Sequence, residues 1–209
     1  HFAPNDPEAL QALTAHYTNG MDWEKAAEFA RRSLEVEAET PGKARGFETL
    51  GDLLRLRSED PQQVAEAYRQ ALRLQPTLFS ARWKLWQILR STGDWKELHG
   101  LGLELLGAGL SDEHEAEVHR VLGRAILMTG GENADALSHF EQALRSGRVD
   151  LGFVEETSEL AYMLGRWELF TALSGQVLER RIDEGLDPEV AMEGYLKLAQ
   201  VFQDELQDV

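Results

Sequence analysis

Two histidines near the middle of the chain flank a pair of glutamates, a combination of residue types that can bind a metal ion. They lie in the segment His114-Glu115-Ala116-Glu117-Val118-His119. A zinc-protease motif needs its two histidines four residues apart, so that both reach one ion from the same face of a helix. Here the histidines are five residues apart, which turns them about 140° away from each other on a helix. We therefore expect no metal site here, and we expect no cofactor elsewhere.

Other catalytic patterns are incomplete or missing. The segment Gly100-Leu101-Gly102-Leu103 lacks the third glycine and the preceding strand of a phosphate-binding loop, and is typical of a helix-packing surface. No serine stands in a Gly-x-Ser-x-Gly setting. The chain has no cysteine, which excludes disulfides, zinc–thiolate sites and cysteine nucleophiles. We predict no catalytic residue and no enzymatic activity.

Three tryptophans indicate how the chain is built. Trp23, Trp95 and Trp167 follow one another at equal intervals of 72 residues. Each is preceded by a short turn-like segment, which is Met21-Asp22, Gly93-Asp94 or Gly165-Arg166. One turn and aromatic signature at a fixed interval predicts a stack of repeated units rather than a single core.

Two further turns fall between the tryptophans. Pro61 and Asn133 occupy the equivalent positions, so the five turns are separated by steps of 38, 34, 38 and 34 residues. Apolar residues recur three and four residues apart in each unit, as Leu10, Leu13 and Tyr17 do in the first. This spacing predicts pairs of amphipathic helices.

Small and large residues alternate along these helices as close helix packing requires. The pattern has three parts: Phe47-x-x-Leu50-Gly51-x-x-Leu54 with Ala67-Tyr68-x-x-Ala71-x-x-x-x-Pro76, Leu122-Gly123-x-x-Ile126 with Ala136-x-x-x-Phe140-x-x-Ala143, and Tyr195-x-x-Leu198-Ala199-x-x-Phe202. In these residues the chain resembles the tetratricopeptide repeat (TPR) family. Bulky Trp86 departs from the pattern at a position that is usually small, and the fifth unit keeps few consensus residues.

The resemblance implies an all-α fold, a right-handed superhelical solenoid of antiparallel helix hairpins. We expect one solenoid domain over residues 1–209, with about five repeats and a terminal helix. The expected units are 7–42, 43–77, 78–112, 113–149 and 150–185, and the terminal helix is 187–205. The first residue is not methionine, and we interpret the chain as a fragment of a longer protein.

The resemblance also implies a groove lined by the first helix of each hairpin. The residues expected to line it face away from the packing positions: Arg45, Arg55, Trp83, Lys84, Gln87, Arg90, Arg120, Arg124, Glu155, Glu159 and Tyr162. Arginines beside an aromatic ring bind carboxylates through forked hydrogen bonds and stacking. The groove is therefore expected to bind a protein or peptide with an acidic patch.

One alternative for these residues stays open, and a second is rejected. The arginines could instead pair with neighbouring glutamates on a solvated face, where an ion pair contributes about 0–1 kcal/mol. Some TPR proteins bind the C-terminal carboxylate of chaperones, but of the corresponding positions Gln11, Ala15, Thr49, Ser80 and Lys84 only Lys84 fits that site. We therefore do not expect chaperone binding.

Composition limits the partners. The net charge of −16 opposes binding to nucleic acid and to anionic membranes. No apolar stretch approaches the roughly 18 residues of a membrane helix, so we expect no direct membrane insertion. The outer side of the last helix is polar, with Lys197, Gln200, Gln203 and Asp204, and we expect the isolated chain to be monomeric.

These observations favour a non-catalytic scaffold that recruits a partner protein through its groove. A narrower hypothesis, by analogy with TPR segments of arginine-rich bacterial proteins, places it in an envelope or exopolysaccharide export assembly. The alternatives are a regulatory peptide-sensing module fused to a kinase or transcription factor, and a structural spacer. The compartment is not defined by the sequence, and the absence of cysteine slightly favours the periplasm over the cytoplasm.

Overall fold

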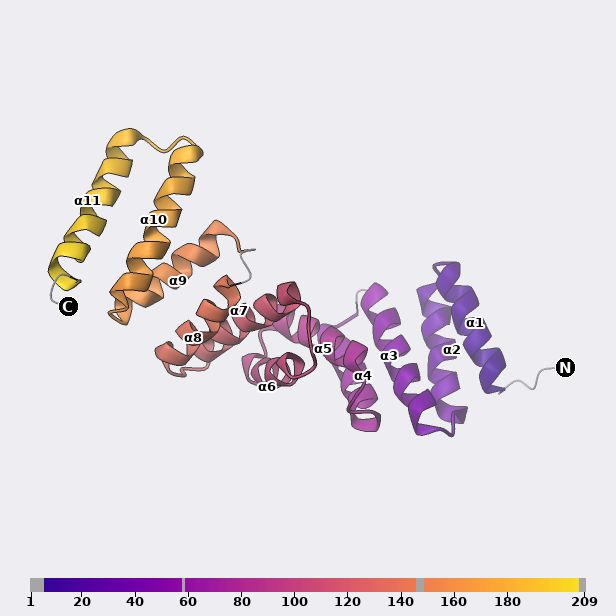
Figure 1. Ribbon diagram of the computed structural model, residues 1–209. Helices are drawn as coiled ribbons and strands as arrows, with labels where there is room; N and C mark the ends of the chain where they lie inside the picture. The colour runs from indigo at the N-terminus through magenta and orange to yellow at the C-terminus, as the bar shows by residue number, and fades with distance from the viewer. Residues whose placement is uncertain (1–5, 58, 146–148, 207–209) are drawn as a thin grey trace. The chain divides into compact units, whose positions relative to one another are not determined.

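The structure is a computed structural model and describes residues 6–57, 59–145 and 149–206. Within these ranges it contains eleven α-helices and no β-strand (Figure 1). Their bounds are α1 Pro7–Asn19, α2 Trp23–Val36, α3 Thr40–Leu56, α4 Pro61–Leu74, α5 Phe79–Thr92, α6 Trp95–Leu106, α7 Asp112–Met128, α8 Asn133–Leu144, α9 Leu151–Met163, α10 Trp167–Asp183 and α11 Pro188–Glu205.

The helices follow one another as five successive pairs, α1–α2 to α9–α10, and α11 comes after the last pair. This confirms the all-α class and the five helical repeats with a terminal helix. The segment Gly100-Leu101-Gly102-Leu103 lies inside α6, as expected. In the described residues no helix is both long and apolar enough to cross a membrane.

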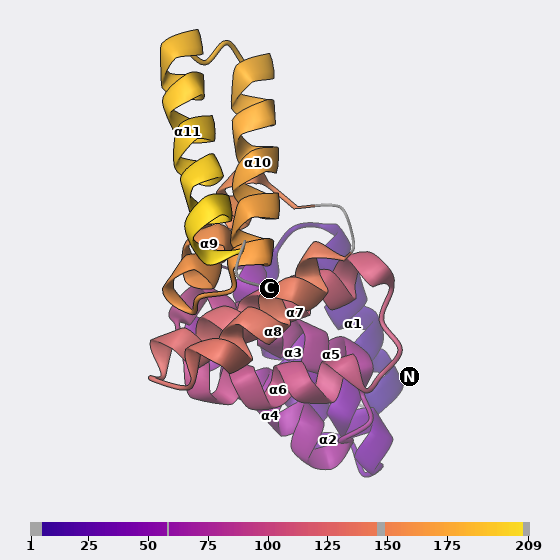
Figure 2. The same cartoon turned by 60° about the vertical axis from the view of Figure 1, so that its left-hand side comes forward.

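Contacts divide the chain into two compact units, residues 1–101 and residues 102–209, which we call unit 1 and unit 2. In unit 1, α1, α2 and α3 lie side by side, and α3 also packs against α4. In unit 2, α7 packs against α8 and α10 packs against both α9 and α11. α10 and α11 lie side by side and run in opposite directions, as both views show (Figures 1 and 2). Whether the whole chain is one domain stays a prediction.

Local signals start the helices. Among the described residues, side chains of six aspartates accept hydrogen bonds from backbone N–H groups in the first turn of a helix: Asp6, Asp22, Asp60, Asp94, Asp150 and Asp187. An aspartate at this point satisfies an N–H that has no partner in the helix and lies at the positive end of the helix dipole. Part of the chain's large negative charge therefore helps to define the helix boundaries.

Backbone conformation explains why glycine stands two positions before Trp95 and Trp167. Gly93 and Gly165 adopt positive φ angles of 76° and 65° at the ends of α5 and α9, a region that side chains disfavour. Met21 takes the same conformation in the first repeat, with φ of 58°. The residue two positions before each tryptophan thus has the same left-handed conformation, although its type differs.

Each well-matched hairpin is closed by an aromatic ring against a helical glycine. In unit 1 the buried ring of Tyr68 on α4 lies over Gly51 of α3, so close that a Cβ at Gly51 would be 2.6 Å from Tyr68 Cε1. In unit 2 the ring of Phe140 on α8 covers Gly123 of α7 in the same way. Phe140 also packs edge-to-face against Phe153 of α9, with ring centroids 5.0 Å apart.

Candidate partner-binding site

In unit 1, Lys84 of α5 is held by two carboxylates of the preceding hairpin. Its ammonium donates hydrogen bonds to Glu48 Oε1 at 2.7 Å and to Asp52 Oδ2 at 2.6 Å, and both acceptors belong to α3. Partial burial lowers the pKa of Lys84, but the two hydrogen bonds outweigh it and leave this pKa above its ordinary value. The first helices of neighbouring hairpins therefore present these side chains to one common face.

The carboxylate of Asp52 also connects this face to the core. Its Oδ1 atom accepts a hydrogen bond of 2.8 Å from the hydroxyl of buried Tyr68. Burial, followed by the nearby charge of Asp52, raises the pKa of Tyr68 above its ordinary value. Tyr68, Asp52 and Lys84 thus form one continuous network, in which the phenol stays protonated at neutral pH.

The aromatic group predicted to anchor a partner is half-buried in a stack. The ring of Trp83 lies between Phe79 and Trp86, with centroid distances of 6.4 and 5.2 Å. The exposed guanidinium of Arg90 lies 5.7 Å from the centre of the Trp86 ring, and Gln87 is exposed on the same helix. Part of Trp83 therefore packs within α5, and the remainder is accessible.

Unit 1 also contains a hollow of about 520 Å³ between α1, α2 and α3. Its wall includes the exposed predicted residue Arg45 of α3, and Glu37 at the end of α2. Apart from Leu34, the remaining lining is small or hydrogen-bonding: Gln11, Thr14, Ala15, Thr18, Asn19, Ala30, Ser33, Gly42, Gly46 and Thr49. The other predicted arginine of α3, Arg55, is exposed near that helix's end and does not line the hollow.

Sequence reasoning missed this hollow. Two glycines four residues apart on α3, Gly42 and Gly46, let this helix lie close to the side chains of Glu37 and Leu34 in the wall of the hollow. The Gly46 backbone approaches Leu34 so closely that a Cβ would lie 2.7 Å from Leu34 Cδ2. The pair of glycines was the available signal, since glycine inside a helix costs about 1 kcal/mol relative to alanine and calls for a packing reason.

In unit 2, Arg120 and Arg124 of α7, which were predicted to line the groove, bind acidic side chains at α9. Arg124 Nε lies 3.1 and 3.2 Å from the two carboxylate oxygens of Glu156, to which its Nη2 also donates. Arg120 donates to Asp150 Oδ2 at 2.7 Å and lies 5.6 Å from the centre of the Phe153 ring. Hydrogen bonding to Glu156 raises the pKa of Arg124. These contacts correspond to the alternative in which arginines pair with neighbouring acids.

The acidic part of the predicted site lies on α9. Glu155 forms an ion pair with Arg181 of α10, whereas Glu159 is exposed. The exposed ring of Tyr162 contacts the rings of Trp167 and Phe170 at centroid distances of 5.3 and 5.1 Å. The structure brings predicted residues together within each unit, and their joint binding of a partner stays a prediction.

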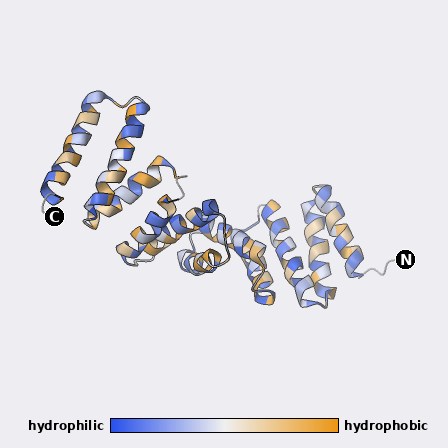
Figure 3. Ribbon diagram, in the orientation of Figure 1, coloured by the Kyte–Doolittle hydropathy of each residue, from blue (hydrophilic) through white to orange (hydrophobic). Residues whose placement is uncertain are grey.

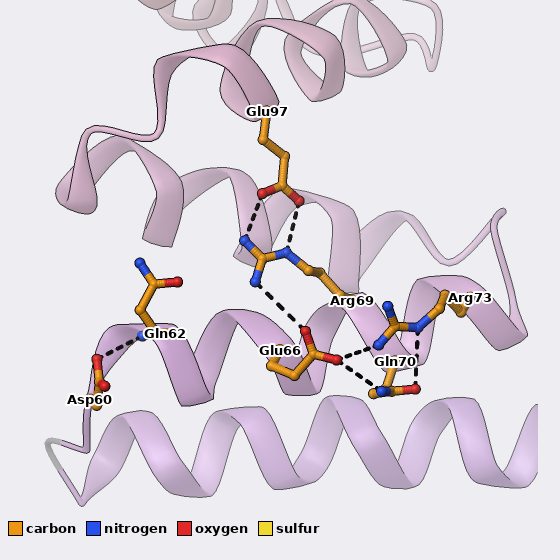
Figure 4. Close-up of polar contacts among 7 residues, drawn as sticks. All are labelled: Asp60, Gln62, Glu66, Arg69, Gln70, Arg73 and Glu97. Carbon is orange, nitrogen blue, oxygen red and sulfur yellow. Dashed lines mark hydrogen bonds and ion pairs between the residues drawn. The ribbon is translucent and has the colours of Figure 1, made fainter.

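The second helices form a comparable contact on unit 1. Arg69 of α4 makes a forked interaction with Glu97 of α6, with Nε–Oε1 at 2.9 Å and Nη2–Oε2 at 2.6 Å (Figure 4). On α4 the same guanidinium also faces Glu66, which accepts hydrogen bonds from Gln70 and Arg73 (Figure 4). Ion pairing between successive hairpins is therefore not confined to the face of the first helices.

The two histidines of the metal-like segment contact different groups. His114 Nδ1 lies 2.8 Å from Ser111 Oγ, whereas His119 faces His139 of α8 with their Nδ1 atoms 2.8 Å apart. Burial lowers the pKa of His119, and the charge of Glu115 partly opposes this effect. Among the described residues, no cluster of three or more histidine and carboxylate side chains could hold a metal ion.

Solved structures with the same architecture define the fold. The MamA RS-1 ArsTM double mutant superposes on this chain with a TM-score of 0.64 at 13% identity, over 90% of this chain and 100% of its own. YrrB, described as a TPR protein with an unusual peptide-binding site, gives 0.62 at 14% identity over 91% and 92%. This chain has the TPR fold.

A third solved structure with this fold is that of PilF of Pseudomonas aeruginosa, with a TM-score of 0.55 and 22% identity over 95% of this chain and 85% of its own. No protein-family model and no curated protein sequence matches the chain. The likeness is therefore one of three-dimensional fold.

Proposed function

We propose that this TPR chain is a non-catalytic scaffold that binds a segment of a partner protein, and that the hollow between α1, α2 and α3 is its principal recognition site. The hollow is the observation that supports this proposal, because it offers a volume of about 520 Å³ lined by side chains that can form hydrogen bonds. Thr18, Asn19, Thr49 and Gln11 can meet the amide groups of an extended peptide, and Arg45 can bind a carboxylate.

The charges favour Arg45 as the residue that selects an acidic partner. Lys84, Arg120 and Arg124 each make ion pairs with carboxylates of the chain itself. A partner must displace those carboxylates before it can use these cations, which costs part of the binding energy. Arg45 lines the hollow in an exposed position, so a partner carboxylate can approach it directly.

The test is a selection of random 12-residue peptides on the native chain, followed by affinity measurements on variants by fluorescence anisotropy. Ala15→Trp, which fills the hollow from an exposed position on α1, and Arg45→Glu, which reverses its charge, should each weaken the selected peptides by about tenfold or more, or about 1.4 kcal/mol. The selected peptides should be rich in aspartate and glutamate.

Matched controls are available on the same helix and on its neighbour. Ala12→Trp makes the same alanine-to-tryptophan change at an exposed position of α1 outside the hollow, and Arg31→Glu reverses an exposed charge on α2. Both should bind the selected peptides as the native chain does. Equal binding by all four variants would place the site elsewhere, and failure to select any peptide would contradict the scaffold proposal.

A narrower setting, a bacterial envelope or exopolysaccharide export assembly in the periplasm, is part of the proposal. Its supports are the excess of arginine over lysine, the lack of cysteine, and the TPR fold shared with PilF of Pseudomonas aeruginosa. Fractionation of the source cells, with detection of the chain by antibody, tests the compartment. Recovery with the cytoplasm would contradict this setting and favour the regulatory module.

A further inference from the structure

Unit 2 contains a cleft of about 790 Å³ between α8 and α10. Its apolar wall includes Leu144 of α8 and Trp167 and Leu169 of α10, and two exposed arginines, Arg145 at the end of α8 and Arg166 directly before α10, lie in the same wall. Hydrophobic and hydrophilic residues are mixed along both helices (Figure 3). The cleft involves the second helices of the fourth and fifth hairpins, whereas the groove predicted from the sequence involves first helices.

The 72-residue interval identifies the corresponding place in unit 1. The segment Gln142-Ala143-Leu144-Arg145 repeats Gln70-Ala71-Leu72-Arg73, and Gly165 and Trp167 repeat Gly93 and Trp95. The sequence of α8 therefore aligns with that of α4, and the start of α10 aligns with the start of α6, without a gap. Each residue of the cleft can be compared with the residue 72 positions earlier.

Ion pairs of the chain itself occupy this place in unit 1. Arg69 of α4 makes its forked interaction with Glu97 of α6, which joins the two second helices (Figure 4). One turn further along α4, Arg73 binds the carboxylate of Glu66 (Figure 4). Both arginines of α4 are thus paired with acidic residues of unit 1.

The fork cannot form in unit 2, because both of its residues are replaced. Glu141 stands at the position of Arg69, and Leu169 stands at the position of Glu97. Glu141 instead pairs with Arg166, at 3.1 Å between Oε1 and Nη2. Half-buried Leu169 therefore gives the cleft an apolar wall where unit 1 has a carboxylate.

Arg145 keeps the arginine of unit 1 but not its acidic partner. It corresponds to Arg73, whereas Ser138 stands at the position of Glu66. Among the described residues, Arg145 donates a hydrogen bond of 3.0 Å to the side-chain oxygen of Gln142. Since its guanidinium is exposed at the cleft, a carboxylate from outside the chain can take the place that Glu66 takes beside Arg73.

We propose that this cleft binds a segment of another protein that carries a single carboxylate beside a large apolar side chain. The carboxylate binds Arg145, and the apolar side chain packs against Leu144, Leu169 and Trp167. The exposed amide of Gln176, which also lines the cleft, can hydrogen-bond the backbone of the segment. This last contact favours a protein segment over a fatty acid, which has no backbone amides.

The other charges of the wall limit the ligand to one carboxylate. Glu168 at the start of α10 and Glu205 of α11 are exposed at the cleft, and they repel further negative charges. The expected ligand therefore differs from the peptides rich in aspartate and glutamate that are expected at the hollow of unit 1. The inference does not require that hollow.

The probe is a panel of fluorescently labelled octapeptides of glycine, serine and glutamine, blocked at both ends. Each peptide carries one glutamate and one leucine or phenylalanine, with zero to three residues between them. Fluorescence anisotropy measures their binding to the full chain. At least one spacing should bind, and its copy with glutamine in place of glutamate should bind about tenfold more weakly, since a charged hydrogen bond is lost.

Two variants test the cleft from the side of the chain. The triple variant Glu141→Arg, Arg166→Asp and Leu169→Glu gives unit 2 the three residues of unit 1. It should weaken the bound peptide by about tenfold or more, because a fork between positions 141 and 169 then occupies the cleft. Arg145→Gln should weaken the glutamate peptide about tenfold and leave its glutamine copy unchanged.

The matched control is Arg180→Gln, which makes the same change at an exposed position of α10 outside the cleft. It should bind the glutamate peptide as the native chain does. Circular dichroism checks that each variant keeps its helices. If the triple variant loses them, the comparison of Arg145→Gln with Arg180→Gln still tests the proposal.

Failure of every spacing to bind, or binding that Arg145→Gln leaves unchanged, would overturn the proposal. Dodecanoate that displaces the peptide and binds more tightly would identify a fatty acid as the occupant. A concentration-dependent dimer that the triple variant abolishes would identify a second copy, and either result contradicts a protein segment. The two sites can fail separately, because Arg45→Glu and Ala15→Trp should leave binding of the octapeptide unchanged.

Discussion

The second and fourth hairpins share a packing contact and differ in the polar groups beside it. Both seat an aromatic ring on a helical glycine, Tyr68 on Gly51 in unit 1 and Phe140 on Gly123 in unit 2. Beside Tyr68 there is a carboxylate, Asp52, which bridges to Lys84 of the next hairpin. Beside Phe140 there is instead a pair of facing histidines on α7 and α8.

The comparison shows that packing and polar interactions are contributed by different residues of the same hairpin. The ring and the glycine bring the two helices together, because they fill the space between them without a polar group. The polar side chains beside the ring determine whether the stability of the hairpin depends on pH or on charges of the next hairpin. In the second hairpin they are charges shared with the following hairpin, and in the fourth they are two imidazoles, of which that of His119 has its pKa lowered by burial.

Removing the rings should have the largest effect and should be similar in the two hairpins. Tyr68→Ala and Phe140→Ala each delete a fully buried aromatic side chain, and we expect a loss of about 3–5 kcal/mol in the free energy of unfolding. Urea unfolding followed by circular dichroism measures this loss. Hydrogen exchange should localise it to α3–α4 or to α7–α8.

The control for this pair is Phe202→Ala, which removes an exposed ring and should cost less than about 1 kcal/mol. If deletion of either buried ring cost no more than this control, the ring–glycine contact would not be what closes the hairpin.

Filling the glycines should have a smaller effect and should distinguish the hairpins. The three atoms nearest to a methyl group at Gly51 all belong to the ring of Tyr68, whereas at Gly123 they are two atoms of the Phe140 ring and the backbone oxygen of Ala136 at 2.9 Å. A side chain can shift more easily than a helix backbone. We therefore expect Gly123→Ala to cost about 1–3 kcal/mol.

Gly51→Ala should cost less, because the ring of Tyr68 can give way and because alanine gains about 1 kcal/mol of helix propensity over glycine. Thermal unfolding of the two variants under the same conditions provides the comparison. Equal shifts, or a larger shift for Gly51→Ala, would contradict the distinction drawn from the backbone contact.

Acidification should produce the smallest effect and should be specific to the fourth hairpin. Burial lowers the pKa of His119 in the folded chain below its ordinary value of 6.5, so the unfolded chain binds the proton more readily. The stabilising contribution is therefore complete above pH 6.5 and declines as the pH falls below it. His139 and Glu115 are the titratable groups that face His119.

The measurement is the thermal midpoint between about pH 5 and pH 8 for the native chain and for His119→Leu. Carboxylates elsewhere titrate in both proteins, so the informative quantity is the difference between the two curves. Parallel curves would show that the histidine pair does not sense pH. Tyr68→Phe is the matched change in the second hairpin. The difference in thermal midpoint between this variant and the native chain should not change with pH in this range.

The sequence predicts the hairpins well because their signals are local. A positive-φ turn, an aspartate cap and apolar residues three and four positions apart all act within one turn or one helix, as at Gly93, Asp94 and Trp95. The same signals located five pairs of helices and a last helix. The departure at Trp86 did not disturb this pattern, and its ring is buried in unit 1.

The site residues were harder to assign because their environments depend on distant parts of the chain. Lys84 is 32 and 36 residues from the two carboxylates that hold it, and charge composition alone does not determine such pairs. The wall of the hollow beside Arg45 includes Gly42 and Gly46, where α3 lies close to Glu37 and Leu34. On α11 the consensus pattern predicted packing residues, but Tyr195 and Phe202 are 43% and 53% exposed.

The principal helix contacts, which join consecutive helices such as α1–α2, α3–α4 and α7–α8, also determine how the chain reaches its folded state. Bringing two such helices together closes a connection of only a few residues, so the entropy lost is small and the step is fast. A hairpin can therefore form as soon as its second helix has left the ribosome, before the remainder of the chain has been synthesised.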